Sequence, residues 1–377
     1  MKVAVPAEID ADEPRVAATP ETVKKIAGLG AEVAIEPGAG AKSGILDADY
    51  AAAGAVVSKQ ATSGADVVLK VRRPQPAELA RCKRGAIVVA MMDPYGRDDI
   101  VRGMADAGVT AFAMELLPRI TRAQAMDVLS SQANLAGYRA VIDAAAEYGR
   151  ALPMMMTAAG TVPAAKVFVM GAGVAGLQAI ATARRLGAIV TATDVRPAAK
   201  EQVESLGAKF IAVEDEEFKA AETAGGYAKE MSKEYQAKQA ALVAEHIKKQ
   251  DIVITTALIP GRPAPRLVSK DMMASMRPGS VIVDLAVERG GNVEGVKADA
   301  VATLGNVKVI GYGNVPGRLA ATASSLYAKN VYAFLEILID KKTKTLAVNW
   351  DDEIVKATAL TRDGTIVHPN FKPKTAA

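Results

Sequence analysis

Short runs of aliphatic and β-branched residues recur along the chain, and between them the apolar positions follow helical spacing. Two series of such runs are typical of strands. The first series consists of residues 2–6, 31–36, 66–71, 86–91 and 109–114, and the second of residues 166–171, 188–194, 208–213, 251–256, 280–285 and 307–312. Strands that alternate with helices are joined by crossover connections and form parallel sheets. The pattern therefore predicts an α/β protein with mainly parallel sheets.

Helix signals separate and flank the two series. Thr19 precedes Pro20, so a helix is expected to begin there, with threonine as its cap and proline in its first turn. Residues 123–150 and 322–340 are each predicted to form one long helix where the chain passes between the series. We predict a first domain from residues 1–137 together with 320–377, and a second domain from residues 138–319.

One segment has the composition of a membrane span. Residues 167–183 contain no charged side chain and approach the length that a bilayer requires. Gly171, Gly173 and Gly176 lie near its start, however, and glycines at this spacing favour a strand, a turn and a buried helix. We therefore expect this segment to lie inside a globular domain.

Composition restricts the function further. The 377 residues include 46 Lys and Arg against 42 Asp and Glu, and this charge of +4 does not indicate nucleic-acid binding. Cys82 is the only cysteine and cannot form an internal disulfide, which fits a reducing compartment. No Cys/His cluster has metal-ligand spacing, so no metal site is expected. Residues 1–13 lack a secretory signal, so a cytoplasmic protein is expected.

Residues 171–176, GAGVAG, follow a predicted strand and begin a predicted helix. In a dinucleotide-binding turn, the first glycine permits the tight turn, the second lets the backbone approach a pyrophosphate, and the third lets the helix pack closely. The amino end of the helix then offers free N–H groups to the phosphates. Together with the two series of strands, this motif predicts two Rossmann-like, doubly wound domains, of which the second binds a dinucleotide.

Asp194 ends the next predicted strand, 18 residues beyond Gly176. A carboxylate there accepts hydrogen bonds from ribose hydroxyls and repels a 2′-phosphate, which favours NAD(H) over NADP(H). Arg196 favours NADP(H) instead, because an arginine at this place accommodates the 2′-phosphate. The residues expected to bind the cofactor around this turn are Gly171, Ala172, Gly173, Val174, Gly176, Asp194, Val195 and Arg196.

Longer stretches resemble a known family. The segments MELLPRITRAQAMDVLSSQANLAGYRAVIDAA, PMMMTAAGTVPAAKVFVMGAGVAGLQAIATARRLGA, TDVRPAAKEQVESLGAKF and ITTALIPGRPAP are similar to the soluble, NAD(H)-binding alpha subunit of proton-translocating NAD(P)+ transhydrogenase. The resemblance extends over nearly the whole chain, and alanine dehydrogenase shares the same ancestry. It implies NAD(H) in the cleft between the domains and hydride transfer to NADP(H) on a partner.

The resemblance also implies an assembly. It implies a homodimer that works with an NADP(H)-binding subunit and a membrane-spanning subunit, which couples hydride transfer to proton translocation. The chain itself would be a separate alpha polypeptide, cytoplasmic and peripherally associated with the inner membrane through these partners.

The family also places residues around the nicotinamide. It implies catalytic roles for Arg119, Gln124 and Asp127, and cofactor contacts for Ser130. Gln124 and Asp127 are one helical turn apart, so a helix would present both on one face. The alternative is a solvated first turn capped by Thr121, with no functional role.

A densely charged segment, residues 214–238, lies between strands of the second domain. By resemblance it is a mobile loop over the cofactor, with Gly226 giving flexibility and Tyr227 contacting the adenosine. Gln239 on the following helix and Leu258 at a strand end are also implied cofactor contacts. Charge alone would indicate only a solvated helix pair.

Histidine distinguishes the two reactions. Oxidation of an amino acid requires a group that takes a proton while hydride leaves, and alanine dehydrogenases use a histidine in the segment that here spans residues 87–96. This segment has none, and His246 and His368 are expected to be surface residues without a role. Hydride transfer between two nicotinamide rings needs alignment and exclusion of water but no such base. Arg15 and Lys70 nevertheless match positions that bind the substrate carboxylate in alanine dehydrogenase.

Three functions are therefore compatible with the sequence. The first is the NAD(H)-binding subunit of a transhydrogenase, and the second is an NAD-dependent alanine dehydrogenase, in which Lys70, Asp93 or Tyr95 would replace the missing base. The third is an NAD-responsive docking subunit with no chemistry of its own.

Overall fold

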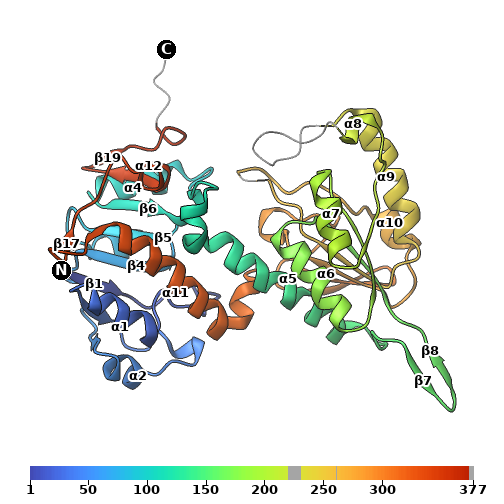
Figure 1. Ribbon diagram of the computed structural model, residues 1–377, viewed down its shortest axis with the longest axis horizontal. Helices are drawn as coiled ribbons and strands as arrows, with labels where there is room; N and C mark the ends of the chain where they lie inside the picture. Colours follow the sequence, from blue (N-terminus) through green and yellow to red (C-terminus); the bar gives the residue numbers. More distant parts are fainter. Residues whose placement is uncertain (220–230, 260, 373–377) are drawn as a thin grey trace. The chain divides into compact units, whose positions relative to one another are not determined.

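The computed structural model describes residues 1–219, 231–259 and 261–372. The chain forms two compact units, Met1–Gln132 with Pro316–Ala377, and Ala133–Val315 (Figure 1). These limits describe compactness, and the division into domains 1–137 with 320–377 and 138–319 stays a prediction.

The first unit contains an eight-stranded sheet in the order β19-β18-β6-β5-β4-β1-β2-β3. Its strands are β1 (Lys2–Val5), β2 (Glu32–Ile35), β3 (Val56–Val57), β4 (Val67–Arg72), β5 (Ile87–Met91), β6 (Thr110–Ala113), β18 (Ala359–Arg362) and β19 (Thr365–Ile366). Strands β1 to β6 pair in parallel, in the order 3-2-1-4-5-6 that characterises a Rossmann-like sheet. The last two strands come from the carboxyl-terminal segment: β18 pairs antiparallel with β6, and β19 pairs antiparallel with β18.

Short helices connect these strands. They are α1 (Pro20–Gly28), η1 (Ala41–Ser43), α2 (Asp47–Ala52), α3 (Pro76–Leu79), α4 (Asp98–Asp106), η2 (Met114–Leu116) and η3 (Thr121–Met126). The carboxyl-terminal segment adds the longer helix α11 (Ala320–Ile337), the small strand pair β16 (Ile339–Asp340) and β17 (Thr345–Leu346), and the helix α12 (Glu353–Thr358). The predicted start of α1 is confirmed, because the Thr19 hydroxyl accepts from the backbone N–H of Thr22 while the Thr22 hydroxyl accepts from that of Thr19.

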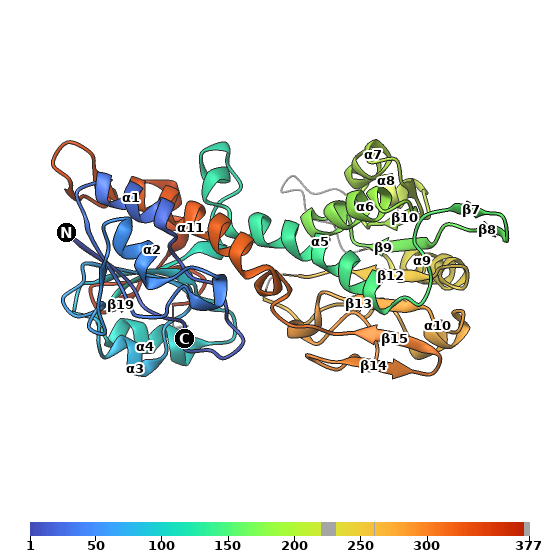
Figure 2. The ribbon, with the colours of Figure 1, turned by 90° about the horizontal axis from the view of Figure 1, so that it is seen from below.

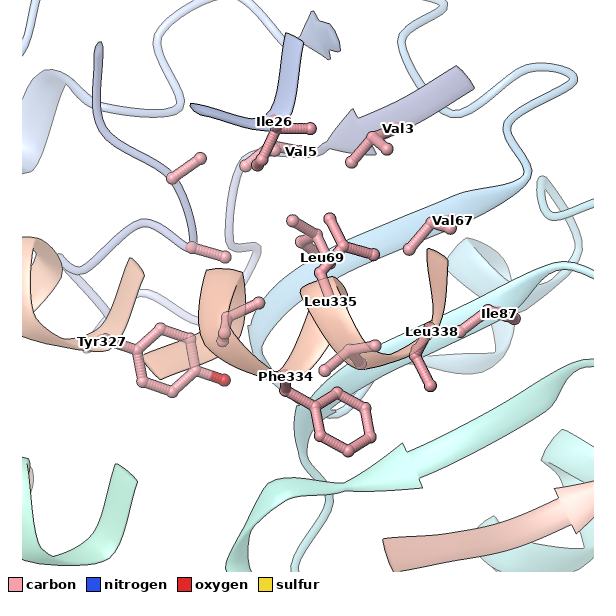
Figure 3. Close-up of a cluster of buried hydrophobic side chains, with 14 of the residues drawn as sticks. Val3, Val5, Ile26, Val67, Leu69, Ile87, Tyr327, Phe334, Leu335 and Leu338 are labelled. Atoms are coloured by element: carbon pink, nitrogen blue, oxygen red, sulfur yellow. The ribbon is translucent and has the colours of Figure 1, made fainter. Parts of the chain in front are cut away.

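Helix α11 supplies much of the core of the first unit. Tyr327, Phe334 and Leu335 on this helix are completely buried. Figure 3 shows all three in the core cluster of this unit, with Leu335 beside Leu69 of β4. The Tyr327 hydroxyl also donates to the carbonyl oxygen of Lys70 at 2.7 Å, so its polar end is satisfied in the core. The carboxyl-terminal segment therefore completes the core begun by residues 1–132.

The second unit repeats the same strand order. Its seven-stranded sheet has the order β11-β10-β9-β12-β13-β15-β14, which Figure 2 shows edge to edge from β10 to β14. The strands are β9 (Lys166–Met170), β10 (Ile189–Thr193), β11 (Lys209–Phe210), β12 (Ile252–Thr255), β13 (Val281–Asp284), β14 (Val301–Leu304) and β15 (Val307–Ile310). All neighbours are parallel except β14 with β15. The prediction of two Rossmann-like units with mainly parallel sheets is confirmed.

Helices and one hairpin complete the second unit. They are α5 (Val128–Glu147), which begins in the first unit, the hairpin β7 (Met155–Thr157) and β8 (Gly160–Val162), α6 (Val174–Arg185), α7 (Ala198–Ser205), α8 (Glu216–Lys219), α9 (Lys233–Ile247), α10 (Lys270–Ser275), η4 (Val287–Arg289) and η5 (Val315–Leu319). The uncharged run 167–183 forms β9, a turn and α6, as the glycines predicted. Among the described residues, no helix has both the length and the apolarity needed to cross a bilayer.

The single long helix expected over 123–150 is wrong. The 3₁₀ helix η3 ends at Met126, Asp127 adopts an extended ψ of 90°, and α5 starts at Val128. The physical reason is the Asp127 side chain, which accepts from the backbone N–H of Ser130 at 2.9 Å. An aspartate that caps the next helix in this way competes with continuation of the previous one.

Candidate functional site

The glycine-rich turn joins β9 to α6 in the second unit. Gly171 has φ +106°, and a Cβ there would lie 2.5 Å from the Thr256 hydroxyl. A Cβ on Gly176 would lie 1.8 Å from the carbonyl oxygen of Gly171, so the helix could not pack against the turn. A Cβ on Gly173, in contrast, would meet nothing within 4 Å. Two of the glycines are thus required by packing, while the third leaves open space beside the turn.

The open space lies at the amino end of α6. Gly173 is the cap residue of this helix and has no side chain that could accept from the first N–H groups. The first turn of a helix has N–H groups without intrahelical partners, and these donors attract anions such as phosphates. The residues present therefore fit a dinucleotide pyrophosphate at this turn.

Asp194 follows β10, which lies next to β9 in the sheet. Its carboxylate accepts from the backbone N–H of Ala172 at 2.7 Å, from the backbone N–H of Arg196 at 2.9 Å, and from two guanidinium nitrogens of Arg196, each at 2.9 Å. Arg196 is thus paired with Asp194, although the sequence suggested opposite effects on cofactor choice. These four hydrogen bonds occupy about as many lone-pair sites as a carboxylate has, so a ribose hydroxyl that binds Asp194 would share or replace one of them, most readily one from the Arg196 side chain.

Several apolar side chains are exposed at the same sheet edge. Val174, Val195 and Leu258 follow β9, β10 and β12, three adjacent parallel strands whose carboxyl ends meet there. Leu258 is 53% exposed, and its neighbour Ile259 is also exposed. Exposed apolar side chains beside polar binding groups are typical of ligand pockets.

Gln239 reaches this edge from α9. Its Oε1 accepts from the backbone N–H of Val213 at 2.9 Å, and its Nε2 donates to the Thr193 hydroxyl at 3.0 Å. The side chain therefore ties the end of β10, immediately before Asp194, to the segment after β11. Gly226 and Tyr227, the other predicted contacts on this side, lie outside the described residues.

Two residues that shape the turn were not predicted from the sequence. The Thr256 hydroxyl donates to the Gly171 carbonyl oxygen at 3.0 Å. The buried Asn292 side chain accepts from the Ala257 backbone N–H and donates to the carbonyl oxygens of Ala257 and Pro265. Thr256 could have been identified from its place at the end of a predicted strand, two residues before Leu258. Asn292 follows a glycine pair in the sequence, which indicates only a turn.

The first unit holds the four residues implied for the nicotinamide. Asp127 and Ser130 are brought together, because the Ser130 hydroxyl donates to the Asp127 carboxylate at 2.5 Å in addition to the backbone contact. Gln124 is exposed in η3, and the Asp127 N–H donates to its carbonyl oxygen at 3.3 Å. Arg119 is exposed in the segment before η3. The predicted capping of this segment by Thr121 is wrong, since η3 has no side-chain cap.

The two basic residues that match alanine dehydrogenase are buried and ion-paired. Lys70 is 1% exposed and lies 2.7 Å from a carboxylate oxygen of Glu78 and 3.1 Å from one of Glu8. Burial works to lower the pKa of Lys70, but these two carboxylates outweigh it and raise that pKa above its ordinary value. Arg15 is paired with the carboxylate of Glu13 in the same way. The charge of each basic group is thus balanced within the protein.

The two histidines are not surface residues, which corrects the sequence-based expectation. His246 is half-buried, its Nε2 lies 2.8 Å from the Thr191 hydroxyl, and its ring packs edge-on against Phe168. Burial lowers the pKa of His246. His368 is buried against Phe371. No group of three or more candidate metal ligands occurs in the described part of the chain.

Two family models match the chain. "Alanine dehydrogenase/PNT, N-terminal domain" matches residues 4–136, and "Alanine dehydrogenase/PNT, C-terminal domain" matches residues 140–369. The chain is 56% identical to an NAD(P) transhydrogenase alpha subunit of Rhodospirillum rubrum over 377 residues, which cover 98% of each protein. It is 30% identical to the alanine dehydrogenase of Halomonas elongata, over 98% of this chain and 95% of that protein.

Solved structures also place this chain nearer to a transhydrogenase than to an alanine dehydrogenase. The transhydrogenase of Sinorhizobium meliloti superposes with a TM-score of 0.90 and 63% identity, over 97% of this chain and 100% of that one. An L-alanine dehydrogenase superposes with a TM-score of 0.83 at 25% identity, over 98% of each chain. The chain therefore belongs to the alanine dehydrogenase/PNT family, and within that family it stands with the transhydrogenase alpha subunits rather than with the alanine dehydrogenases.

Proposed function

We propose that the chain is the NAD(H)-binding subunit of a proton-pumping transhydrogenase. It exchanges hydride between NAD(H) that it binds and NADP(H) on a partner subunit. A membrane-spanning partner couples this exchange to proton translocation, and the chain works in the cytoplasm, peripherally associated with the inner membrane. The observation that carries the proposal is the open position at Gly173 beside an uncapped helix, in a chain 56% identical to a transhydrogenase alpha subunit.

In this proposal each group of residues has a distinct task. The turn from Gly171 to Gly176 binds the pyrophosphate with backbone N–H groups, Asp194 accepts from the adenosine ribose, and Leu258 packs against the cofactor. Ala172, Val174, Val195, Arg196, Gly226, Tyr227 and Gln239 complete the proposed binding set. When bound, the nicotinamide supplies the hydride, which leaves its ring with the bonding electron pair and adds to the ring of the partner's NADP+.

The residues of the first unit position the reacting ring. Gln124, Asp127 and Ser130 offer amide, carboxylate and hydroxyl groups to the carboxamide and ribose, and Arg119 lies at the same segment. No proton leaves the reacting carbon, so positioning groups without a general base suffice. This assignment agrees with the absence of histidine from residues 87–96.

The proposed reaction can be tested by mixing purified subunits. The chain combined with its NADP(H)-binding and membrane-spanning partners is expected to transfer hydride from NADH to an NADP+ analogue, followed by absorbance. The chain alone is expected to show no turnover with alanine, or with pyruvate and ammonia. Robust turnover of alanine would instead indicate an alanine dehydrogenase, and NADH binding without hydride transfer in the mixture would indicate a docking subunit.

Two glycine variants separate ligand binding from folding. Gly173→Ala places a methyl group in open space, so we expect an unchanged melting temperature and NADH affinity about tenfold lower, because the pyrophosphate can no longer approach the backbone. Gly176→Ala forces a methyl group against the Gly171 carbonyl and should reduce stability by about 1–3 kcal/mol. Calorimetric titration and thermal unfolding measure both effects. Wild-type NADH affinity in Gly173→Ala would refute the assignment of this turn.

Cofactor choice depends on the pair of Asp194 and Arg196. Asp194→Asn removes the negative charge and frees the guanidinium group to bind a 2′-phosphate, so the ratio of NADH to NADPH affinity should fall about tenfold. Arg196→Gln serves as the matched control and should not gain NADPH affinity. Fluorescence titration with both nucleotides gives the ratio, and an unchanged ratio in Asp194→Asn would count against the ribose role.

The chain works as a homodimer in this proposal, and the hairpin β7–β8 supplies contact to the second copy. The hairpin extends away from the sheet and helices of its unit (Figure 1). Met155 and Met156 point to opposite faces of β7, and both are exposed, Met156 by 79%. A two-stranded hairpin is marginally stable alone, and exposed apolar side chains of this kind mark interaction surfaces.

Met156→Asp should therefore convert the dimer to monomers at micromolar concentration, measured by analytical ultracentrifugation. The control is Leu46→Asp, since Leu46 is also exposed but stands at a helix cap where aspartate is well accepted. A Met156→Asp protein that sediments as the wild type would exclude the hairpin from the interface.

A further inference from the structure

A network of buried polar side chains leads from the loop after β1 to the segment that carries Gln124 and Asp127. Arg15 is 3% exposed, and its Nε and Nη2 atoms donate to the two carboxylate oxygens of Glu13 at 2.7 and 2.6 Å. Its third nitrogen, Nη1, donates to Oε1 of Gln132 in α5 at 2.8 Å. Each of the three guanidinium nitrogens is therefore engaged within the first unit.

The network continues from α5 into α11. Gln132 is 5% exposed, and its Nε2 donates to the Ala323 carbonyl at 3.1 Å and to the Ser131 hydroxyl at 3.3 Å. The Ser131 hydroxyl donates to Oδ1 of Asn330 at 2.7 Å, and Nδ2 of Asn330 donates to the Ala125 carbonyl at 2.8 Å. The network thus holds η3 through Ala125 and α5 through Ser131 and Gln132.

The beginning of the network is fixed by charge. The Glu13 carboxylate is buried and also accepts from Nε of Arg72 at 2.8 Å. Burial works to raise the pKa of Glu13, but its contacts with Arg15 and Arg72 hold that pKa below the ordinary value. The buried Glu13 carboxylate contacts the guanidinium groups of both Arg15 and Arg72. A planar guanidinium fork in contact with a carboxylate has one favourable orientation.

The segment between the two fixed points is the proposed nicotinamide site. Residues 124–130 run from the turn held through Ala125 to the turn next to Ser131, and Asp127 interrupts the helix between them. A break in a helix leaves the backbone without the continuous hydrogen bonds that would otherwise fix it. The network replaces that lost support with buried side-chain hydrogen bonds whose members satisfy one another.

We propose that Arg15, acting through Gln132, is a positioning residue for hydride transfer, which holds residues 124–130 in the one arrangement that aligns the nicotinamide ring. The inference rests on the proposed role of Gln124, Asp127 and Ser130. Arg15 therefore acts within the protein itself, whereas the residue at the matching position of alanine dehydrogenase binds the substrate carboxylate. Because the reaction depends on alignment, a displacement of about 1 Å costs about 100-fold in rate.

The test is Gln132→Met in the complete complex with its partner subunits. Methionine keeps the shape of the side chain but neither accepts from Arg15 nor donates to Ala323. We expect kcat for hydride transfer to fall about 10- to 100-fold, while KM for NADH changes less than about threefold, because the adenosine and pyrophosphate contacts of the second unit remain. Partial unfolding would also lower the apparent kcat at unchanged KM, so kcat is calculated per folded, NADH-binding complex, and the split between kcat and KM then identifies positioning.

Thr361→Val is the matched control. The Thr361 hydroxyl is buried in the same unit, donates to the Val109 carbonyl at 2.8 Å and accepts from the Ala111 N–H at 3.2 Å, outside the network. Its loss should lower the melting temperature and leave kcat at the wild-type value. A Gln132→Met complex with kcat within twofold of wild type, or lowered no more than in Thr361→Val, would overturn the inference.

A second variant keeps the inference open to refutation if Gln132→Met does not fold. Ser131 is only partly buried, and Ser131→Ala removes the link to Asn330 while Arg15 and Gln132 remain paired. We expect a smaller fall in kcat, about three- to tenfold, with KM for NADH unchanged. Wild-type kcat in Ser131→Ala would overturn the inference. A wild-type complex that transfers no hydride would overturn the proposed function on which the inference rests.

Discussion

The second unit depends on the contact between α6 and the carbonyl group of Gly171. The helix lies so close to the turn that no side chain fits between them at Gly176. This approach brings the free N–H groups of α6 to the carboxyl ends of three parallel strands, where Asp194 accepts from the Ala172 N–H and Thr256 donates to Gly171. One steric requirement thus sets the place of the anion-binding donors, the carboxylate and the apolar side chains together.

The first unit uses a polar side chain for a comparable purpose. Asp127 ends η3 and caps α5, so the backbone changes direction where the family resemblance places the nicotinamide contacts. A continuous helix would be more regular, but it would present Gln124 and Asp127 from the surface of one uninterrupted helix. The interruption costs local hydrogen bonding, and the buried contacts of Gln132 and Asn330 offset that cost.

Local sequence was sufficient for much of this architecture. The β-branched runs, the cap at Thr19 and the glycine turn depend on neighbouring residues, and all were predicted. Strand β18 was missed because its pairing partner, β6, lies far away in the chain, and β19, which pairs with β18, was missed with it. The break at Asp127 was missed although aspartate is one of the preferred residues at a helix N-cap.

The site was predictable as a set of residues and less so as a set of contacts. Sequence identified Arg15 and Lys70 as notable cations, but only the folded chain brings each to its carboxylates and buries the pairs. The pairing of Arg196 with Asp194 is local, and the effect of the two side chains on cofactor choice stays a prediction. The predicted contacts at Gly226 and Tyr227 lie outside the described residues and stay predictions.

The position of α11 and β18 in the first unit has a consequence for synthesis of the protein. The ribosome produces residues 1–132 first, but the helix that fills their core and the strands that extend their sheet are made only after residue 315. The second unit, uninterrupted in sequence, has all its strands available earlier. We expect the usual amino-to-carboxyl order of folding to be reversed, with nascent residues 1–132 exposing apolar surface that chaperones bind until the chain is complete.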